Sequence, residues 1–464
     1  MSSPSPAAAH HASTSDGLPV PRRYWAIAAI LLSICMSVLD STITNVALPT
    51  IARDFHASPA ASIWVVNAYQ LAILVVLLPL ASLGEVLGYR RVSQAGLIVF
   101  TLASLACALA PSLVTLSVAR LIQGLGAAGI VSVNAALVRF TYPHRYLGRA
   151  IGINAFVVAT SAALGPTIAS AVLAVAQWRW LFGINVPLGL ITIAIARYAL
   201  PDVERIHRPL NHLGALLYAG MFGLLLSGLQ SLAHHSATSL ALTQIAGGVL
   251  LGTALVRRER GREAPLIPFD LLRVRLFRLS LAASICAFVG QMCALVALPF
   301  EIQRLGHSAV ETGLYMTPWP VALALTAPIA GRLSERYPAG LLGGAGLLIM
   351  AVGLALLAYL PAAGTAAGFI WRMAVCGFGF GLFQSPNNHA ILSSAPRARS
   401  GAAGGMLSTS RLAGQTLGAA AVAILFRAYP ATGSNLALSA AAALTLIAAL
   451  VSLIRLTGSE GAPP

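Results

Sequence analysis

Two residues that could take part in proton coupling, Asp40 and Arg120, lie deep inside long apolar stretches of this sequence. A carboxylate at that depth in a membrane costs on the order of 3 kcal/mol to insert, so it is a functional candidate by default. Desolvation disfavours its charged form, so Asp40 can load and release a proton. Asp40 and Arg120 lie roughly 9 and 12 Å from the outer ends of their predicted helices, depths at which they could meet. The pair therefore predicts proton coupling.

Each residue also has a structural alternative. Asp40 could serve only to cap its helix or to snorkel at the helix end, but the helix is predicted to continue past it. Arg120 could pair with backbone carbonyl groups instead of coupling protons, and the sequence leaves that choice open. No GxxxxGK[ST] motif occurs, and the five cysteines show no CxxC spacing. We therefore expect no enzyme activity, no cofactor and no metal site.

The elements that position these residues are predicted to be membrane-spanning helices. Hydrophobic residues make up 58% of the chain and charged residues only 9%, a composition typical of polytopic membrane proteins. A span needs about 20 apolar residues. That rule predicts an all-α protein with fourteen spans near 24–46, 60–80, 92–110, 113–137, 147–174, 180–200, 211–232, 239–256, 277–300, 312–331, 341–360, 366–390, 400–427 and 435–456.

The basic residues indicate the orientation of these spans. The net charge is +16, and every basic residue is an arginine. Most of the arginines fall in short loops on one side of the predicted spans, which is the pattern of cytoplasmic loops rather than of a nucleic-acid surface. We therefore expect a multi-pass protein of the cytoplasmic (inner) membrane with both termini in the cytoplasm and no nucleic-acid partner.

The sequence repeats itself at a nearly constant offset. Val46–Pro49 recurs 250 residues later as Val296–Pro299, and Arg120 has its counterpart in Arg372. Parallel six-helix repeats with a substrate site between them are a known plan of transporters. In the second copy Gly290 stands where the first has Asp40. The predicted domains are a disordered tail at 1–23, six-helix bundles at 24–200 and 277–456, two inserted helices with a basic loop at 201–276, and a tail at 457–464.

Several motifs carry a resemblance to a known family. They are Asp40–Pro49, Ala81–Arg91, Leu116–Ala128, Gly165–Pro166 and Trp178–Gly189. Together they resemble the fourteen-helix drug:proton antiporter branch of the major facilitator superfamily, over nearly all of residues 24–456. The second motif departs from the family pattern at Ala81, Glu85 and Val86. The motif that begins with Gly165–Pro166 departs from it at Ala169–Ser170.

The resemblance implies a proton-coupled antiporter for multidrug efflux, which exports amphipathic and often cationic organic compounds. Its partners would be the substrate, protons and the lipid bilayer, and we expect a monomer. Charged helix ends can clamp in one state and release in the other, and small residues allow close helix packing. The gating candidates are Glu85, Gly88, Arg90, Arg91, Gly165, Pro166 and Glu335.

Polar, aromatic and methionine residues at positions expected to face the space between the halves are the candidates for substrate binding. These are Asn45, Trp64, Asn67, Tyr69, Gln70, Asn154, Phe156, Gln291, Met292, Phe383 and Asn387. Helix packing or lipid contact is the structural alternative for each. Two rival functions stay open, namely a facilitator or proton symporter for a small metabolite and a transporter-like sensor or scaffold.

Overall fold

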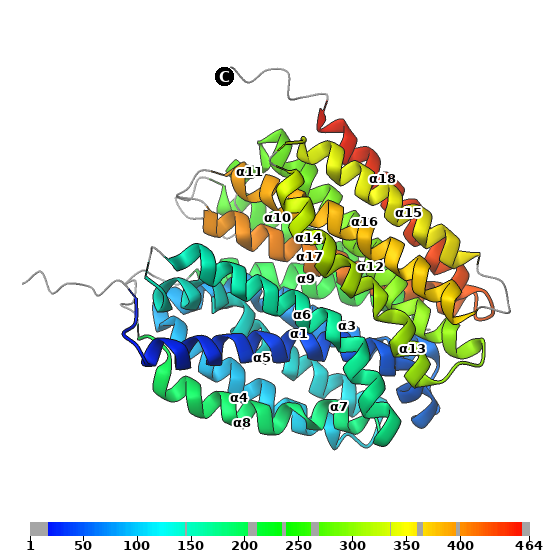
Figure 1. The fold of residues 1–464 in the computed structure, drawn as a ribbon, viewed down its shortest axis with the longest axis horizontal. Helices are drawn as coiled ribbons and strands as arrows, with labels where there is room; N and C mark the ends of the chain where they lie inside the picture. The colour runs from blue at the N-terminus through cyan, green and yellow to red at the C-terminus, as the bar shows by residue number, and fades with distance from the viewer. Residues whose placement is uncertain are drawn as a thin grey trace, which may run out of the picture.

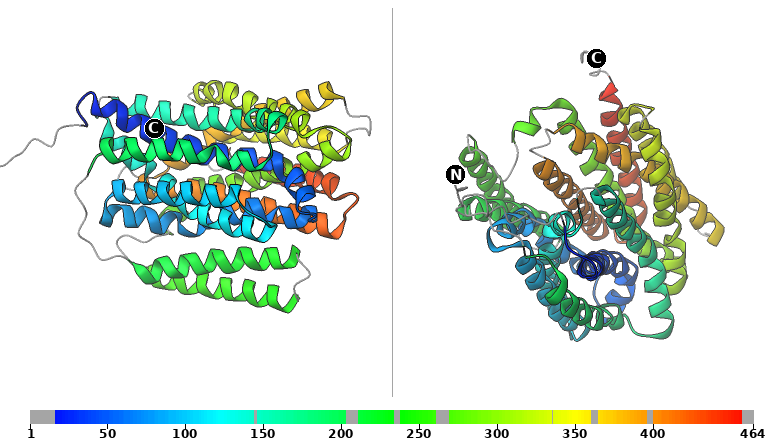
Figure 2. Two further views of the ribbon diagram at one scale, coloured as in Figure 1. Left: turned by 90° about the horizontal axis from the view of Figure 1, so that it is seen from below. Right: turned by 60° about the vertical axis from the view of Figure 1, so that its left-hand side comes forward.

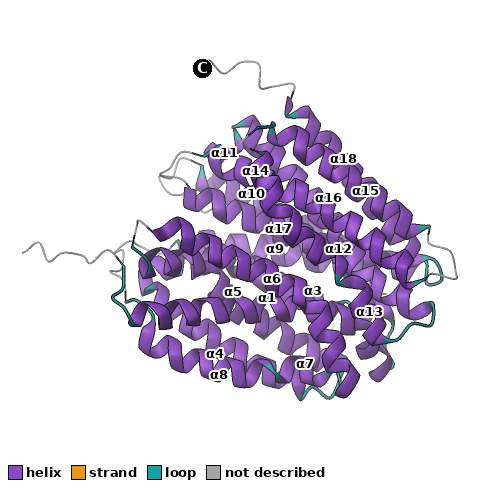
Figure 3. Cartoon of the chain, in the orientation of Figure 1, coloured by secondary structure: helices purple, strands orange, loops and turns teal. Residues whose placement is uncertain are grey.

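The structure is a computed structural model that describes residues 17–143, 146–202, 211–233, 238–260, 269–334, 336–359, 365–395 and 400–456. These residues form helices joined by short turns, and no strand occurs among them (Figure 3). The helices are α1 (Arg22–Asp54), α2 (Pro59–Ser62), α3 (Trp64–Leu87), α4 (Tyr89–Ala108), α5 (Leu113–Thr141), α6 (Leu147–Val175), α7 (Arg179–Gly183), α8 (Asn185–Ala199), α9 (His212–Ala233), α10 (Thr238–Glu259), α11 (Phe269–Leu272), α12 (Arg275–Arg304), α13 (Ala309–Met316), α14 (Pro318–Leu333), α15 (Ala339–Ala358), α16 (Ala366–Ser393), α17 (Ser400–Ala428) and α18 (Gly433–Ile454).

Twelve helical segments of the described chain are long and apolar enough to cross a membrane. They correspond to twelve of the fourteen predicted spans. The two remaining predictions, 312–331 and 400–427, fall on helices that are not among the twelve. The first is divided at Thr317 into α13 and α14, and the second is α17, which carries several polar side chains. A count of fourteen spans is therefore not confirmed and stays a prediction.

The long helices form two groups of similar construction (Figure 1). In the N-terminal half α1 packs against α5, α6 and α8, and in the C-terminal half α12 packs against α16, α17 and α18. Helices α9 and α10 form a hairpin at the outside of the molecule (Figure 2). Within that hairpin α9 contacts both α3 and α17, so it packs against both halves. The domain boundaries proposed from the sequence stay predictions.

Local sequence sets where several helices begin and end. Ser112 and Ser308 each form a capping box, in which the hydroxyl oxygen accepts the backbone N–H three residues later. Gly88 ends α3 with a φ of +100°, a conformation that glycine adopts without strain. We call the end of the molecule that carries Arg22 and Arg90 the inner end, and the end that carries the two serine caps the outer end.

The two halves meet through hydrogen bonds at the outer end. Arg53 donates to the side chain of Gln303 at 2.7 Å, and the Ser170 hydroxyl donates to the Val310 carbonyl at 2.9 Å. A Cβ atom added at Gly313 would lie 1.9 Å from the Ser170 hydroxyl oxygen, so the helices are in close contact there. Figure 1 shows the long helices of the two halves diverging from this region toward the inner end.

Candidate functional site

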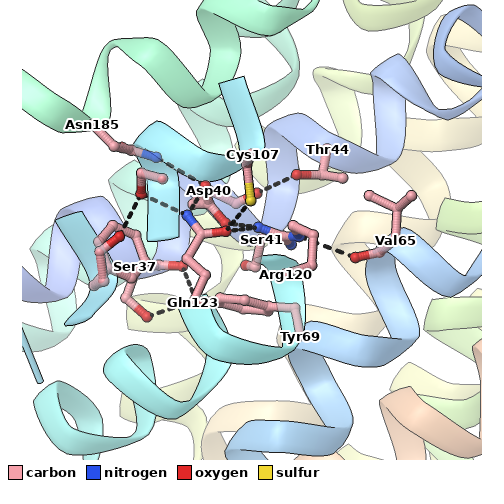
Figure 4. A network of polar contacts seen from close by, with 12 residues as sticks. Ser37, Asp40, Ser41, Thr44, Val65, Tyr69, Cys107, Arg120, Gln123 and Asn185 are labelled. Atoms are coloured by element: carbon pink, nitrogen blue, oxygen red, sulfur yellow. Dashed lines mark hydrogen bonds and ion pairs between the residues drawn. The ribbon is translucent and has the colours of Figure 1, made fainter. Parts of the chain in front are cut away.

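The carboxylate of Asp40 is fully buried inside the N-terminal half (Figure 4). Its Oδ2 atom accepts a short hydrogen bond from Nη1 of Arg120 in an ion pair. Its Oδ1 atom accepts from the side-chain amides of Gln123, at 2.9 Å, and of Asn185, at 2.8 Å. The structure thus brings Asp40 and Arg120 together, as their depths suggested, and surrounds the carboxylate with three donors from α5 and α8.

Arg120 is held on several sides as well. Its Nε atom donates to the carbonyl oxygen of Val65 at 3.0 Å, and Nη1 also donates to Gln123 Oε1 at 2.6 Å. The guanidinium carbon lies 4.2 Å from the centre of the Tyr69 ring, within the range of a cation–π contact. Both interpretations from the sequence therefore describe part of its surroundings, because Arg120 binds a carboxylate and a backbone carbonyl.

A second layer of contacts fixes these side chains. The Gln123 amide donates to the Ser104 hydroxyl at 2.8 Å, and the Tyr69 hydroxyl lies 3.1 Å from the Ser37 hydroxyl. The Thr44 hydroxyl donates to the main-chain carbonyl of Asp40 at 2.8 Å. Five helices of one half thus supply a continuous polar network around a single buried ion pair. Losing one charge of such a pair leaves the other uncompensated, which is strongly unfavourable, so protonation of Asp40 would act on the whole network.

Sequence reasoning did not identify Gln123, Asn185 or Ser104 as part of this site. A signal for Gln123 was present, because it follows Arg120 by three residues on an otherwise apolar helix and therefore shares its face. Asn185 lies in the motif Trp178–Gly189, where it was noted without a role. Ser104 gave no signal, because serine is common in helices that pack closely in a membrane.

Two of the predicted substrate residues, Gln70 and Met292, meet across the two halves. The Gln70 amide on α3 lies 3.8 Å from the sulfur of Met292 on α12. Asn67 is 1% exposed, and neither its amide nitrogen nor its amide oxygen has a hydrogen-bond partner among the described residues. The Asn45 side-chain oxygen also lacks one. Gln291, next to Met292, is largely buried.

Other predicted substrate residues lie elsewhere, because their side chains are engaged within one half. Tyr69 belongs to the network around Asp40, and Asn154 accepts a hydrogen bond from Asn134 at 3.1 Å. Phe383 is buried inside the C-terminal half against Phe380. These positions do not support substrate contact.

Asn387 is likewise fully buried within the C-terminal half. Its amide oxygen accepts from Arg455 at 2.8 Å, and its amide nitrogen donates to the Ser280 carbonyl at 3.3 Å. Trp64 is half-buried at the start of α3. Phe156 is 69% exposed. It lies three turns before Thr167, on the same face of α6. The Thr167 hydroxyl on that face lies 2.8 Å from the Thr317 hydroxyl of the other half.

The gating candidates fall at both ends of the molecule. At Gly165 an added Cβ atom would lie 2.0 Å from the Thr42 hydroxyl oxygen, so α6 packs directly on α1 one residue before Pro166. At the inner end Arg90 donates to the Arg197 carbonyl, Arg91 is exposed and Glu85 is half-buried. Glu335 lies outside the described residues.

The sequence is similar to several transporters. It is 53% identical to "Uncharacterized transporter YebQ" of Escherichia coli over 96% of this chain and 98% of the relative. It is 31% identical to "Riboflavin transporter RibZ" of Clostridioides difficile, over 86% and 87% of the two chains. It is 31% identical to "Multidrug resistance protein Stp" of Mycobacterium tuberculosis, over 86% and 75%.

The family follows from a match to a family model. Residues 30–419 match the sequence model of the Major Facilitator Superfamily. That range covers the Asp40 network and all but the last part of the C-terminal half, and the all-helical arrangement of two similar halves agrees with it. The chain is a multi-pass transporter of the Major Facilitator Superfamily.

Proposed function

We propose that this protein is a proton-coupled antiporter that exports amphipathic organic compounds across the cytoplasmic membrane, with fourteen spans and both termini in the cytoplasm. The observation that carries the proposal is the ion pair of Asp40 and Arg120, buried in the middle of one half and enclosed by amide donors. A carboxylate at that position is costly and has no role in closing a helix end. Proton loading is the function that best accounts for it.

The coupling step would act through α1. Protonation of Asp40 removes the negative charge that balances Arg120, so the guanidinium must rely on the Val65 carbonyl and on Gln123. The free energy with which α1 packs against its neighbours then changes. On another face of the same helix Thr42 packs against Gly165, next to the outer contacts of α6 with the C-terminal half. A shift of α1 would therefore bias whether the outer end is closed.

The closed outer end would be one of two alternating states. Gly165 and Pro166 would let α6 move against α1 and α13, while Glu85, Gly88, Arg90 and Arg91 would form the opposing clamp at the inner end, together with Glu335. Substrate would bind between the halves near Gln70 and Met292, which already touch across the interface. Proton and substrate sites would thus be separate, and they would communicate through helix position.

The expected preference for cations does not follow from this arrangement. Both oxygens of Asp40 already accept hydrogen bonds, and the side chain is 0% exposed, so it has no free face to offer a cationic ligand. The similarity to a multidrug resistance protein supports export of varied organic compounds. The similarity to a riboflavin transporter keeps a second candidate, a facilitator or symporter for one metabolite.

Everted membrane vesicles distinguish these functions. The vesicles carry the wild type, Asp40→Asn or no transporter, and uptake of a panel of fluorescent amphipathic compounds is followed while a pH gradient, acidic inside, is imposed. We expect gradient-dependent accumulation in the wild type and only equilibration in Asp40→Asn. A symporter would accumulate substrate with the opposite gradient, and a facilitator would ignore the gradient. Either result would overturn the antiport proposal.

A further inference from the structure

Arg411 is a second arginine in the middle of a helix, and the network around Asp40 does not use it. It lies 11 residues after the start of α17, about 16 Å from the inner end. Its side chain is partly exposed, and its guanidinium has no hydrogen-bond or ion-pair partner among the residues that the structure describes. An arginine at mid-membrane is costly, so an unpaired one calls for a partner that is not part of the chain.

The neighbours of α17 fix the direction in which Arg411 points. On one side the Ser410 hydroxyl donates to Ser284 of α12 at 3.2 Å. On a second side an added Cβ atom at Gly405 would lie 3.0 Å from the Leu78 side chain of α3. At about 100° per residue, Arg411 falls between these two sides.

The remaining side of α17 is occupied. Helix α9 packs against both α17 and α3 from outside, and its Leu226 joins Leu412 and Ala413 in one apolar cluster. Because α9 covers this third side of α17, the face that carries Arg411 turns toward the space between the two halves. Gln415, one turn further along α17, lies on the same face.

The opposite side of that space carries amides. Because α3 and α17 run in opposite directions, the contact of Leu78 with Gly405 brings Arg411 level with residue 72 of α3, about one turn below Asn67 and close to Gln70. Leaving a buried amide unsatisfied is unfavourable, so each such group in a native protein needs a partner in some state. Asn67 lies three residues before Gln70 and so shares its face of α3, and its unpartnered amide and the weak sulfur contact of Gln70 leave hydrogen-bonding capacity on the side of α3 that meets α12.

The charge of this region is positive. Among the acidic residues that the structure describes, Asp40 alone lies in the middle of a membrane helix, and Arg120 already balances it. Glu85 is 13 residues further along α3 than the level of Arg411, roughly 20 Å away and far beyond ion-pair distance. A cationic ligand placed here would meet an uncompensated positive charge, whereas an anionic one would neutralise it.

We propose that the substrates of this transporter are amphipathic carboxylates, whose anionic group is held by Arg411 while the amides of Asn67 and Gln70 bind uncharged polar groups. This inference rests on the proposed export function and names its substrate class. The planar guanidinium binds a carboxylate through two parallel hydrogen bonds, and such charge-assisted bonds are strong where water is excluded. Export of an anion is also downhill in a membrane potential that is negative inside, at about 2.3 kcal/mol per charge per 100 mV.

A binding experiment tests the inference without relying on a pH gradient. Purified full-length protein in detergent is titrated with three fluorescent probes that share one ring system, namely anthracene-9-carboxylate, the uncharged 9-anthracenecarboxamide and the cationic 9-(aminomethyl)anthracene. We expect the carboxylate to bind the wild type most tightly. Arg411→Gln should weaken carboxylate binding at least tenfold, about 1.4 kcal/mol, and change carboxamide binding less than twofold.

Two further variants make the result specific. Arg411→Lys keeps the charge but loses the planar fork, so it should recover part of the lost affinity. Arg372→Gln is the matched control, because Arg372 also lies in a membrane helix but donates to the Gly368 carbonyl at 2.9 Å and stacks on Trp371. It should bind the carboxylate as the wild type does.

Three results would overturn the inference: tighter binding of the ammonium probe, no binding of the carboxylate to the wild type, or unchanged carboxylate affinity in Arg411→Gln. Failure of the antiport proposal would look different. It would appear in vesicles as transport that ignores the pH gradient while the carboxylate preference persists. In Asp40→Asn we expect carboxylate binding to be kept and gradient-driven transport to be lost.

Discussion

The buried pair of Asp40 and Arg120 makes a quantitative prediction about what each partner does for the other. Asp40→Asn removes the negative charge but keeps the shape of the side chain. Its carbonyl oxygen can still accept from Gln123 and Asn185, as Oδ1 does now. Its new NH₂ group faces Nη1 of Arg120, so a donor meets a donor where the ion pair was. We expect the variant to fold, at reduced stability and without proton coupling.

The size of the effect follows from what Arg120 retains. Breaking a buried ion pair by removing one partner costs about 3–5 kcal/mol. Arg120 keeps the Val65 carbonyl, the Gln123 oxygen and the Tyr69 ring, so the lower end, about 3 kcal/mol, is expected. Arg120→Gln should cost a similar amount, because it strands the Asp40 carboxylate.

The double variant Asp40→Asn/Arg120→Gln places two neutral amides side by side. Replacing a whole buried ion pair by uncharged groups is often close to neutral, so the double variant should be more stable than either single variant. The cycle should give a coupling energy of about 3 kcal/mol or more. All three variants should equilibrate substrate without accumulating it.

Unfolding in detergent by denaturant, followed by tryptophan fluorescence, measures the three stabilities. Ser37→Ala is the control, since it removes one partner of the Tyr69 hydroxyl, which keeps the Ser37 carbonyl, and it should cost about 1 kcal/mol. Additive destabilisation in the double variant would show that the two residues are not coupled. Gradient-driven accumulation by Asp40→Asn would refute the proton-loading role even if the stability cycle behaves as expected.

Three further predictions concern topology and gating. Reporter fusions after Arg23 and after Arg455 should both report the cytoplasm, and opposite locations would contradict the arrangement of two parallel repeats. Gly313→Ala should disfavour the closed outer end, since its Cβ atom would lie 1.9 Å from Ser170, and raise cysteine labelling from outside; Gly223→Ala, which meets nothing within 4 Å, should leave labelling unchanged. Glu85→Gln should shift labelling between the two sides without loss of membrane insertion, whereas unchanged labelling would reduce Glu85 to ordinary surface charge.

Depth in the membrane was readable from the sequence, whereas direction around a helix was not. The compatible depths of Asp40 and Arg120 followed from counting residues along two apolar helices, because the rise per residue is fixed. The direction of Tyr69, Asn154 and Asn387 did not follow, because helices buried on several sides carry apolar residues all round and give no outward face to measure from. Only the packed structure distinguishes Gln70, which contacts the other half, from its neighbour Tyr69, which contacts Ser37 and Arg120.

The break between α13 and α14 at Thr317 is a second feature that was not predicted from the sequence. The apolar run from 312 to 331 is long enough for one span, although Pro318 and Pro320 follow Thr317 directly. Proline at position 318 is compatible with a new helix start as well as with a kink. The Thr317 hydroxyl meets Thr167 of the other half at 2.8 Å, so the break lies at the contact between the halves, which no local rule anticipates.

The separation of the two charged centres has a mechanistic consequence. Asp40 is enclosed in the N-terminal half, and Arg411 faces the space between the halves from α17, so a substrate at Arg411 cannot take the proton site by direct competition. Coupling must then pass through an element that touches both. Helix α12 does so, because it packs against α1, which carries Asp40, and against α17, where Ser284 of α12 contacts the residue before Arg411. A proton on Asp40 would act on α1 and an anion at Arg411 would act on α17, and exchange would follow if each ligand favours a different packing of these helices on α12.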